Sequence, residues 1–164
     1  MQQETFTQAS LKELTEYVVA RHHAFLRRQL PAISELFQSA QDNSSTAPAT
    51  VADAGNIFTT VRTKIETHLR DEEQFLFPNG VSLAEGGVAE VCELDLKGRL
   101  EEMEREHDNA GLALENCRRL LINEASTDSK LKELVIALTS LIDDLSEHVR
   151  IENTYIHPIL KKYL

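Results

Sequence analysis

The sequence predicts an all-α protein, an antiparallel up-down four-helix bundle. Four long segments carry apolar residues at intervals of three and four, the spacing of a helix with one buried face. Polar stretches separate these segments, and the 164 residues include only 6 Gly and 4 Pro, which disfavours a loop-rich or all-β fold. Helices of this length joined by modest loops pack best as a bundle. We expect one domain over residues 1–164.

The first helix is expected over residues 8–40, where Pro31 predicts a kink or a short break. Residues 41–56 are rich in Ser, Thr, Ala and Asp, which is typical of a loop. The second helix is expected to follow from Ile57. It should end near Pro78, because the next two residues, Asn and Gly, favour a turn.

The third helix is expected after the two glycines at 86–87, and its buried stripe alternates four and three residues apart. The members of this stripe are Leu96, Leu100, Met103, His107, Ala110, Leu114, Cys117 and Leu121. Residues 126–128 (Ser, Thr, Asp) are good N-caps and predict the start of the fourth helix. The apolar pattern of that helix continues to Ile159.

Charge and composition exclude several classes of protein. The chain has 27 acidic and 17 basic residues and a net charge of -10, which disfavours binding to nucleic acid. No segment approaches the roughly 18 consecutive apolar residues of a membrane span. The first residues also lack the pattern of a signal peptide. Because Cys92 and Cys117 form no disulfide framework, we expect a reduced, cytoplasmic protein.

Ionisable residues interrupt two of the apolar stripes. His68 and Glu72 occupy successive inward positions of the second helix, and His148 and Glu152 do the same in the fourth. An i, i+4 pair projects from one helix face, so each pair points into the bundle. A buried carboxylate costs several kcal/mol unless it is paired, hydrogen-bonded or metal-bound. Two such pairs on different helices therefore need a shared partner.

The two pairs belong to an internal repeat. Residues 68–78 read HLRDEEQFLFP and residues 148–158 read HVRIENTYIHP, with His, Arg, Glu, aromatic, aliphatic and Pro at identical offsets. His23 and His107, 84 residues apart, add one histidine to each half. We expect two helical hairpins that bring together four imidazoles and two carboxylates. These candidate metal ligands are His23, His68, Glu72, His107, His148 and Glu152.

This set suits a pair of metal ions. If both carboxylates bridge the two metal ions, each ion receives two nitrogen ligands and two oxygen ligands. A bridging oxide would be the fifth ligand of each ion, and the sixth coordination position would stay open. Such ligands fit iron, manganese or zinc, and an open position is typical of a functional site. A ferritin-like site needs two Glu-x-x-His sequences, and only Glu104 and His107 match. Glu104 is therefore expected at the helix surface or supporting a ligand. The alternative is a metal-free polar network.

These residues resemble the hemerythrin-like di-iron domains, and most closely the branch of the repair-of-iron-centres proteins. The matching stretches are Arg21-His22-His23 with Leu30-Pro31, residues 68–73 with 76–78, residues 103–111 and residues 148–153. The resemblance implies a four-helix bundle around two non-haem, carboxylate-bridged iron ions, held by the six candidate ligands; manganese and zinc stay open. It also selects His23 over His22, between which periodicity alone does not decide.

The sequence departs from the family pattern in three respects. Residues 38–45 lack the further histidine that the repair branch supplies, and Gly111 stands where oxygen-carrying hemerythrins have a histidine. Water, Asp42 or a displaced side chain would then replace the missing ligand. The cysteine-bearing N-terminal domain usual in the repair branch is also absent from this sequence. His157, two turns beyond Glu152, is expected at the end of the bundle.

The sequence favours a protein that binds or senses a small diatomic ligand, O2 or NO, in the response to nitrosative or oxidative stress. The alternative is a di-iron redox enzyme or an iron donor in the repair of iron–sulfur centres. Turnover would need an electron donor, and we find no motif for flavin, haem or nucleotide. A homodimer is a further option that the sequence leaves open.

Overall fold

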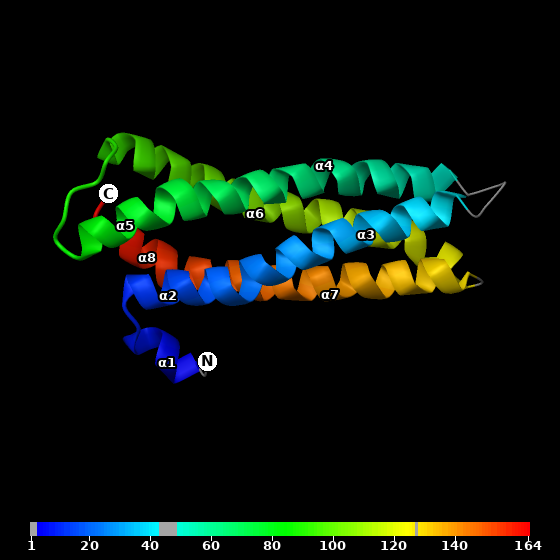
Figure 1. Cartoon of the computed structure of the whole chain (residues 1–164), viewed down its shortest axis with the longest axis horizontal. Coiled ribbons are helices and arrows are strands. Elements are labelled where there is room, and N and C mark those ends of the chain that lie inside the picture. Colours follow the sequence, from blue (N-terminus) through cyan, green and yellow to red (C-terminus); the bar gives the residue numbers. More distant parts are fainter. Residues whose placement is uncertain (1–2, 43–48, 127) are drawn as a thin grey trace.

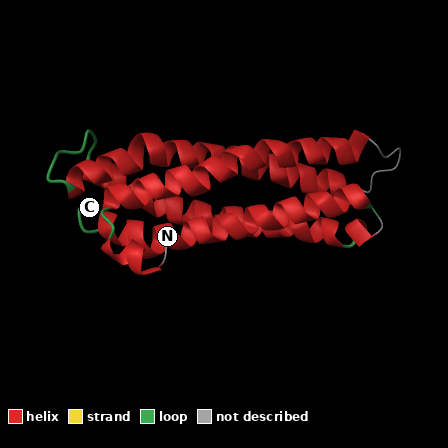
Figure 2. Ribbon diagram, turned by 60° about the horizontal axis from the view of Figure 1, so that its bottom comes forward, coloured by secondary structure: helices red, strands yellow, loops and turns green. Residues whose placement is uncertain are grey.

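The computed structural model describes residues 3–42, 49–126 and 128–164, and it confirms the predicted fold. Four long helical rods run antiparallel to one another in up-down order (Figure 1). The described part of the chain contains helices and connecting loops but no strand (Figure 2). The N-terminal helix and the C-terminus lie toward the same end of the bundle, as expected for four antiparallel rods.

The first rod is a series of helical segments that follow one another with little interruption. It consists of α1 (Gln3–Gln8), α2 (Leu11–Val18), a π-helical turn (Val19–His23) and α3 (Ala24–Asp42). A capping box starts α2: the Ser10 hydroxyl accepts from the Glu13 amide, and the Glu13 carboxylate accepts from the Ser10 amide. Helix α3 contains Pro31 and shows no break there, so of the two predicted outcomes the break is not observed.

The second rod is longer than predicted at both ends. It consists of α4 (Ala49–Asp71), a π-helical turn (Glu72–Leu76) and α5 (Phe77–Ala84). The predicted loop over 41–56 is wrong for residues 41–42, which belong to α3, and for residues 49–56, where Val51 and Ala54 already bury an apolar face. Residues 43–48 lie outside the described part. The predicted end at Pro78 is also wrong. Pro78 stands in the first turn of α5, where its missing N–H needs no acceptor.

The third and fourth rods are joined by a short connection that includes a 3-10 turn, Glu124–Ser126. They consist of α6 (Glu93–Ile122), α7 (Ser129–Ile151), a π-helical turn (Glu152–Ile156) and α8 (His157–Leu160). Asp128 caps α7, since its carboxylate accepts from the Lys130 and Leu131 amides at 2.8 and 3.3 Å. Of the other predicted caps, Ser126 ends the 3-10 turn and Thr127 is outside the described residues.

The three π turns are defined by hydrogen bonds that reach five residues back. The amides of Ala24, Phe77 and His157 donate to the carbonyls of Val19, Glu72 and Glu152 respectively. Each π turn adds one residue to an α-helical turn and so rotates the following face by about 100°. A prediction that assumes 3.6 residues per turn does not allow for this extra residue, so it misplaces the face of the helix that follows each π turn.

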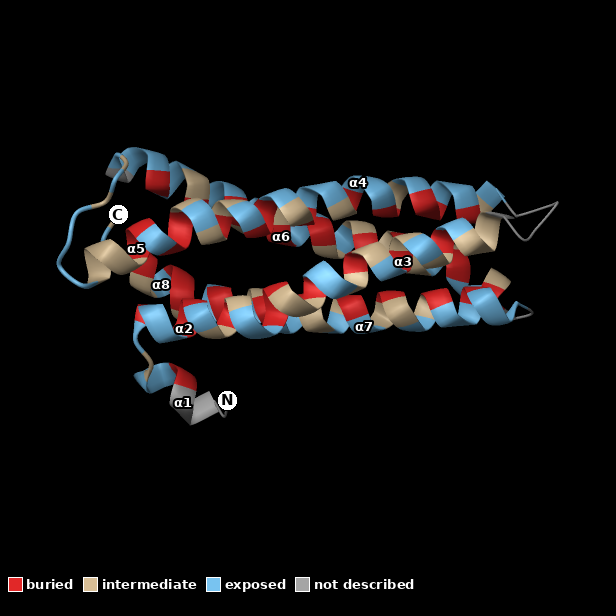
Figure 3. Cartoon of the chain, viewed as in Figure 1, coloured by how far each residue is buried: buried red, intermediate tan, exposed pale blue. Residues whose placement is uncertain are grey.

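Two apolar clusters fill the bundle, and a polar layer separates them. Buried positions follow the inward faces of the rods along their whole length (Figure 3). On the second rod Leu69 belongs to one cluster and Leu76 to the other; on the third, Ala110 and Met103 are divided in the same way. The residues between them form the polar layer, which is therefore held in place by packing on both sides.

The structure also shows the state of the two cysteines and the character of the helices, on which the sequence analysis made predictions. Both cysteines are free: Cys92 is exposed, whereas Cys117 is buried and donates to the Ala54 carbonyl at 3.3 Å. Burial raises the pKa of the Cys117 thiol to about 12, which makes it unreactive. Among the helices described, none combines the length and the apolar character that crossing a membrane requires.

Candidate metal centre

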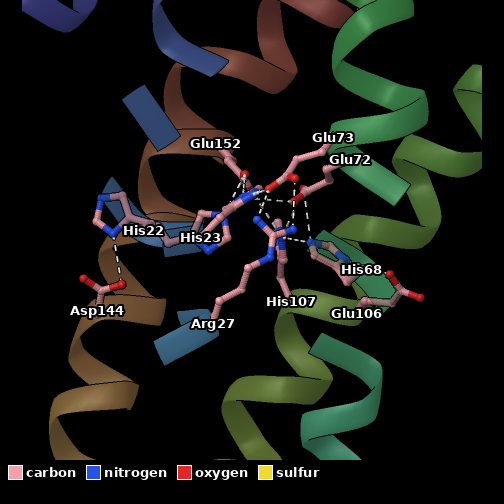
Figure 4. Close-up of polar contacts among 11 residues, drawn as sticks. His22, His23, Arg27, His68, Glu72, Glu73, Glu106, His107, Asp144 and Glu152 are labelled. Atoms are coloured by element: carbon pink, nitrogen blue, oxygen red, sulfur yellow. Dashed lines mark hydrogen bonds and ion pairs between the residues drawn. The ribbon is translucent and has the colours of Figure 1, made fainter. Parts of the chain in front are cut away.

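All six candidate ligands meet in the polar layer between the two apolar clusters. Figure 4 labels His23, His68, Glu72, His107 and Glu152 among them. They form two groups, in each of which one ligand atom per residue lies within 4.8 Å of the others. Subsite A contains His23 and His148, and subsite B contains His68 and His107; both groups include Glu72 and Glu152. Each subsite therefore has two imidazoles and two carboxylates, as the count from the sequence required.

The two carboxylates each place one oxygen in each subsite. Oε2 of Glu72 lies 3.4 Å from Nε2 of His23, and Oε1 lies 3.1 Å from Nε2 of His68. Oε1 of Glu152 lies 2.7 Å from Nε2 of His148, and Oε2 lies 3.0 Å from Nε2 of His107. This is the arrangement of carboxylates that bridge two metal ions.

The four imidazoles present Nε2 to the centre of the layer. These atoms face each other in pairs, 3.2 Å apart in subsite A and 2.9 Å apart in subsite B. Nδ1 of His23 donates to Glu73 and Nδ1 of His68 donates to Glu106, each at 2.7 Å. In the neutral form these two rings then keep a lone pair on Nε2, which is the form that a metal ion needs.

The buried oxygens fit a cation better than a metal-free network. Glu72 and Glu152 are fully buried, and both oxygens of Glu72 and Oε2 of Glu152 have no hydrogen-bond partner. Unsatisfied buried carboxylate oxygens are costly and rare in folded proteins. Two cations placed between the opposed nitrogens and these oxygens would satisfy both sets of lone pairs. The mixed nitrogen and oxygen donors suit iron, manganese or zinc.

The buried carboxylates and imidazoles of the polar layer shift each other's pKa values. Burial disfavours protonation of His68, but the charge of Glu72 and close contacts with the carboxylates of Glu72 and Glu106 raise the pKa of His68 to about 9. Burial likewise opposes ionisation of Glu152, yet the charge of His148 and its hydrogen bond hold the pKa of Glu152 well below its ordinary value. Protonation of His68 and His148, whose pKa values are both raised by the buried carboxylates, is therefore favoured when nothing else balances those carboxylates.

His22 is buried beside the layer rather than in it. Its Nδ1 lies 3.1 Å from Asp144 (Figure 4), and its ring lies parallel to that of His148, with the centroids 5.8 Å apart. Of the two neighbours, His23, which the family resemblance selected, is the one that lies in a His/Glu cluster. The sequence left His22 as an outward histidine, a supporting histidine or a replacement ligand, and its burial excludes the first of these. The π turn that ends at His23 lets both residues be buried.

The expectation that His157 is a bundle-end residue is wrong. Its side chain is buried, and its ring lies parallel to that of His107, with the centroids 5.9 Å apart. The π turn before it explains the difference, because five residues after Glu152 then correspond to four in an α-helix. Glu104, expected at the surface or in support, contacts Lys161 at 2.6 Å and His157 at 3.3 Å and does not join either subsite.

The supporting carboxylates Glu73 and Glu106 were not found from the sequence. Each directly neighbours a candidate ligand, Glu72 or His107, and this adjacency is the one signal that the sequence offers. Glu73 is also held by Arg27, which donates to its two oxygens at 2.8 and 2.9 Å. Burial opposes ionisation, but the Arg27 and His23 contacts lower the pKa of Glu73. Asp42 was a candidate to replace the ligand that the sequence lacks, but its side chain lies outside the described part of the structure.

Fold and site together define a helical bundle with two buried, carboxylate-sharing His/Glu clusters of the kind that hold a pair of metal ions. The chain belongs to the hemerythrin family: the profile of the hemerythrin HHE cation binding domain matches residues 15–160.

The chain is also similar to curated proteins from several bacteria. The iron-sulfur cluster repair protein YtfE of Edwardsiella ictaluri is 29% identical over 160 residues, which cover 96% of this chain and 69% of that protein. YtfE of Dickeya chrysanthemi is 27% identical over 157 residues, 92% of this chain and 66% of that protein. YtfE of Escherichia coli O157:H7 is 28% identical over 155 residues, with the same two shares. The chain thus spans about two thirds of the length of these relatives.

Proposed function

We propose that this protein binds two iron ions through His23, His68, Glu72, His107, His148 and Glu152 and acts in the repair of iron–sulfur centres. The observation that carries the metal site is the pairing of opposed Nε2 atoms with carboxylate oxygens that have no other partner. The repair role is supported by the names of the relatives. Those names favour the alternative drawn from the sequence over the diatomic-ligand sensor.

The chain's own residues would prepare the site for a cation. Glu73 and Glu106 keep a proton on Nδ1 of His23 and His68, so that Nε2 is free to coordinate. Glu72 and Glu152 supply negative charge to both subsites at once and would keep the two ions together. Iron bound there would supply open coordination positions and a change of oxidation state.

The proposal is tested by mixing the iron-loaded protein with a dehydratase whose iron–sulfur cluster has lost iron. Recovery of the dehydratase activity, together with an equal loss of iron from this protein, supports donation. The matched control is the Glu152→Ala protein, treated with iron in the same way, which should restore nothing. Free iron at the same concentration, offered in the presence of a chelator that captures it, sets the background.

A second candidate function, binding of O2 or NO, rests on the number of protein donors. Each subsite has only four, which leaves positions for an exogenous ligand. If the visible spectrum of the iron-loaded protein changes when NO is added, while the damaged dehydratase stays inactive, the sensor is favoured. If neither the spectrum nor the dehydratase responds, both functions are wrong.

A further inference from the structure

The two subsites differ in how completely they are enclosed. The residues His23 and His148 in subsite A are 0% exposed, while His68 and His107 in subsite B are each 5% exposed. Aromatic rings cover both histidines of subsite A: Phe77 lies nearly parallel to His23 at 6.0 Å between centroids, and His22 lies parallel to His148 at 5.8 Å. In subsite B the ring of His157 covers His107 in the same way, but none is stacked on His68 among the described residues. Since His22 is itself buried, no side chain of subsite A reaches the surface.

Subsite B, in contrast, lies at the end of a groove between α4 and α6. The groove has a volume of about 470 Å³ and ends at His68, Glu106 and His107. It extends along α4 from Asn56, a distance of roughly 18 Å at 1.5 Å per residue. Ile57, Val61, Ile65, Ala110 and Ala113 provide its apolar lining. A second hollow, of about 540 Å³, also reaches His107 from the α6–α7 side.

The supporting carboxylates differ in the same direction. Glu73, which holds His23, accepts two hydrogen bonds from Arg27 and is fixed by this fork-like contact. Glu106, which holds His68, lines the groove, and its other charged contact within the described residues is Arg99 at 3.8 Å. His68 is therefore oriented by a more exposed and less restrained partner than His23.

From these three observations we propose that subsite B is the exchangeable position, through which metal enters and leaves along the α4–α6 groove, and that subsite A retains its metal. The carrier that we assign to the groove is a small anionic chelator, which would pair with Lys64, one helical turn before His68. Among the described residues that line the groove, Lys64, which is exposed, carries the one ammonium or guanidinium group, and Glu106 at the inner end is the one carboxylate. This inference rests on the proposed binding of two iron ions.

The test measures iron release from this chain after it has been loaded with Fe²⁺. With excess ferrozine, an anionic chelator, we expect one iron per chain to leave quickly and one slowly. His107→Ala should retain one slowly released iron, whereas His148→Ala should retain one rapidly released iron. Two irons that leave at the same rate, or the opposite behaviour of the two variants, would overturn the inference while leaving the di-iron proposal intact. A chain that binds no iron would instead defeat the di-iron proposal.

Groove-filling variants test the route. Asn109→Trp places a ring on the groove lining, and helical side chains lean toward the N-terminus, here toward His107. It should slow the fast phase about tenfold and leave the slow phase unchanged. Asn116→Trp, two turns further along α6 and outside the groove, is the matched control and should leave both phases as they are. An equal effect of both substitutions contradicts the route.

Lys64→Glu tests the charge of the carrier. Reversal of this charge should slow capture by ferrozine about tenfold at low ionic strength, since local charge steers anions. Capture by the uncharged chelator 2,2′-bipyridine should not change. If both chelators respond equally, the groove does not select an anionic carrier.

Discussion

Nδ1 of His23 donates a hydrogen bond to Glu73 at 2.7 Å, and this contact determines which ring nitrogen faces subsite A. Glu106 does the same for His68 in subsite B. The two carboxylates lie outside the candidate ligand set, yet they fix the tautomer and the orientation of one imidazole in each subsite. The orientation of these two candidate ligands thus depends on residues outside the candidate set.

Glu73→Gln should weaken metal binding at subsite A. Loss of the carboxylate lets the His23 ring change tautomer, and such supporting residues typically contribute about 10–100-fold to metal affinity. Competition titration with a coloured chelator measures the change. Glu101→Gln, an exposed position on α6, is the control and should bind metal normally. Equal affinities for all three proteins would mean that Glu73 only pairs with Arg27.

Glu152→Ala should abolish the binding of both metals, because this carboxylate contributes an oxygen to each subsite. His148→Ala, which removes a ligand of subsite A alone, should retain one metal. The measurement is metal per chain by elemental analysis after loading and desalting. Glu147→Ala, on the same helix but directed toward Arg150, should retain two. A Glu152→Ala protein with both metals would disprove the shared-carboxylate arrangement.

The stability of the metal-free protein should fall as pH rises. The folded-state pKa of His68 is raised from 6.5 to about 9, and that of His148 is also raised. A raised pKa means that protonation stabilises the fold fully below about pH 6.5, and that this stabilisation is lost as pH rises through 9. Urea unfolding at several pH values measures the effect. A flat profile between pH 6.5 and 9 would contradict it; His68→Gln should show a smaller slope.

Leu138→Ala should destabilise the bundle without changing the metal ratio. Leu138 is fully buried in the apolar cluster away from the polar layer, and such truncations cost about 2–5 kcal/mol. Ile136→Ala, two residues away and 69% exposed, should change the free energy of unfolding by less than about 0.5 kcal/mol. Both unfolding experiments use the metal-free protein. A loss of metal from the folded Leu138→Ala protein would show that the layer and the cluster are coupled.

Much of this architecture was predictable because it follows from helical periodicity. The inward stripe of α6 is buried as expected from Leu96 to Leu121, and the two His-x-x-x-Glu pairs converge as the repeat indicated. Identical spacing in two hairpins requires their ligands to meet at the same level. For this reason the sequence predicted which residues gather, even without the structure.

The remainder was not predictable because it depends on departures from that periodicity. The π turn at Glu152–Ile156 rotates His157 from the expected bundle end to the face that contacts His107. Helix α4 begins at Ala49 because Val51 and Ala54 have an apolar partner surface that composition does not reveal. The partners of His23 and His68 depend on which neighbouring rods meet, so Glu73 and Glu106 emerged only from three-dimensional contacts.

The most direct test of this account is the number of metal ions per chain in the protein loaded with Fe²⁺ under anaerobic conditions and then desalted. The opposed nitrogens and shared carboxylates predict two iron ions per folded chain, and none in Glu152→Ala. A protein that stays folded and metal-free after loading would contradict the account. It would leave the six buried residues as a hydrogen-bonded network of the bundle.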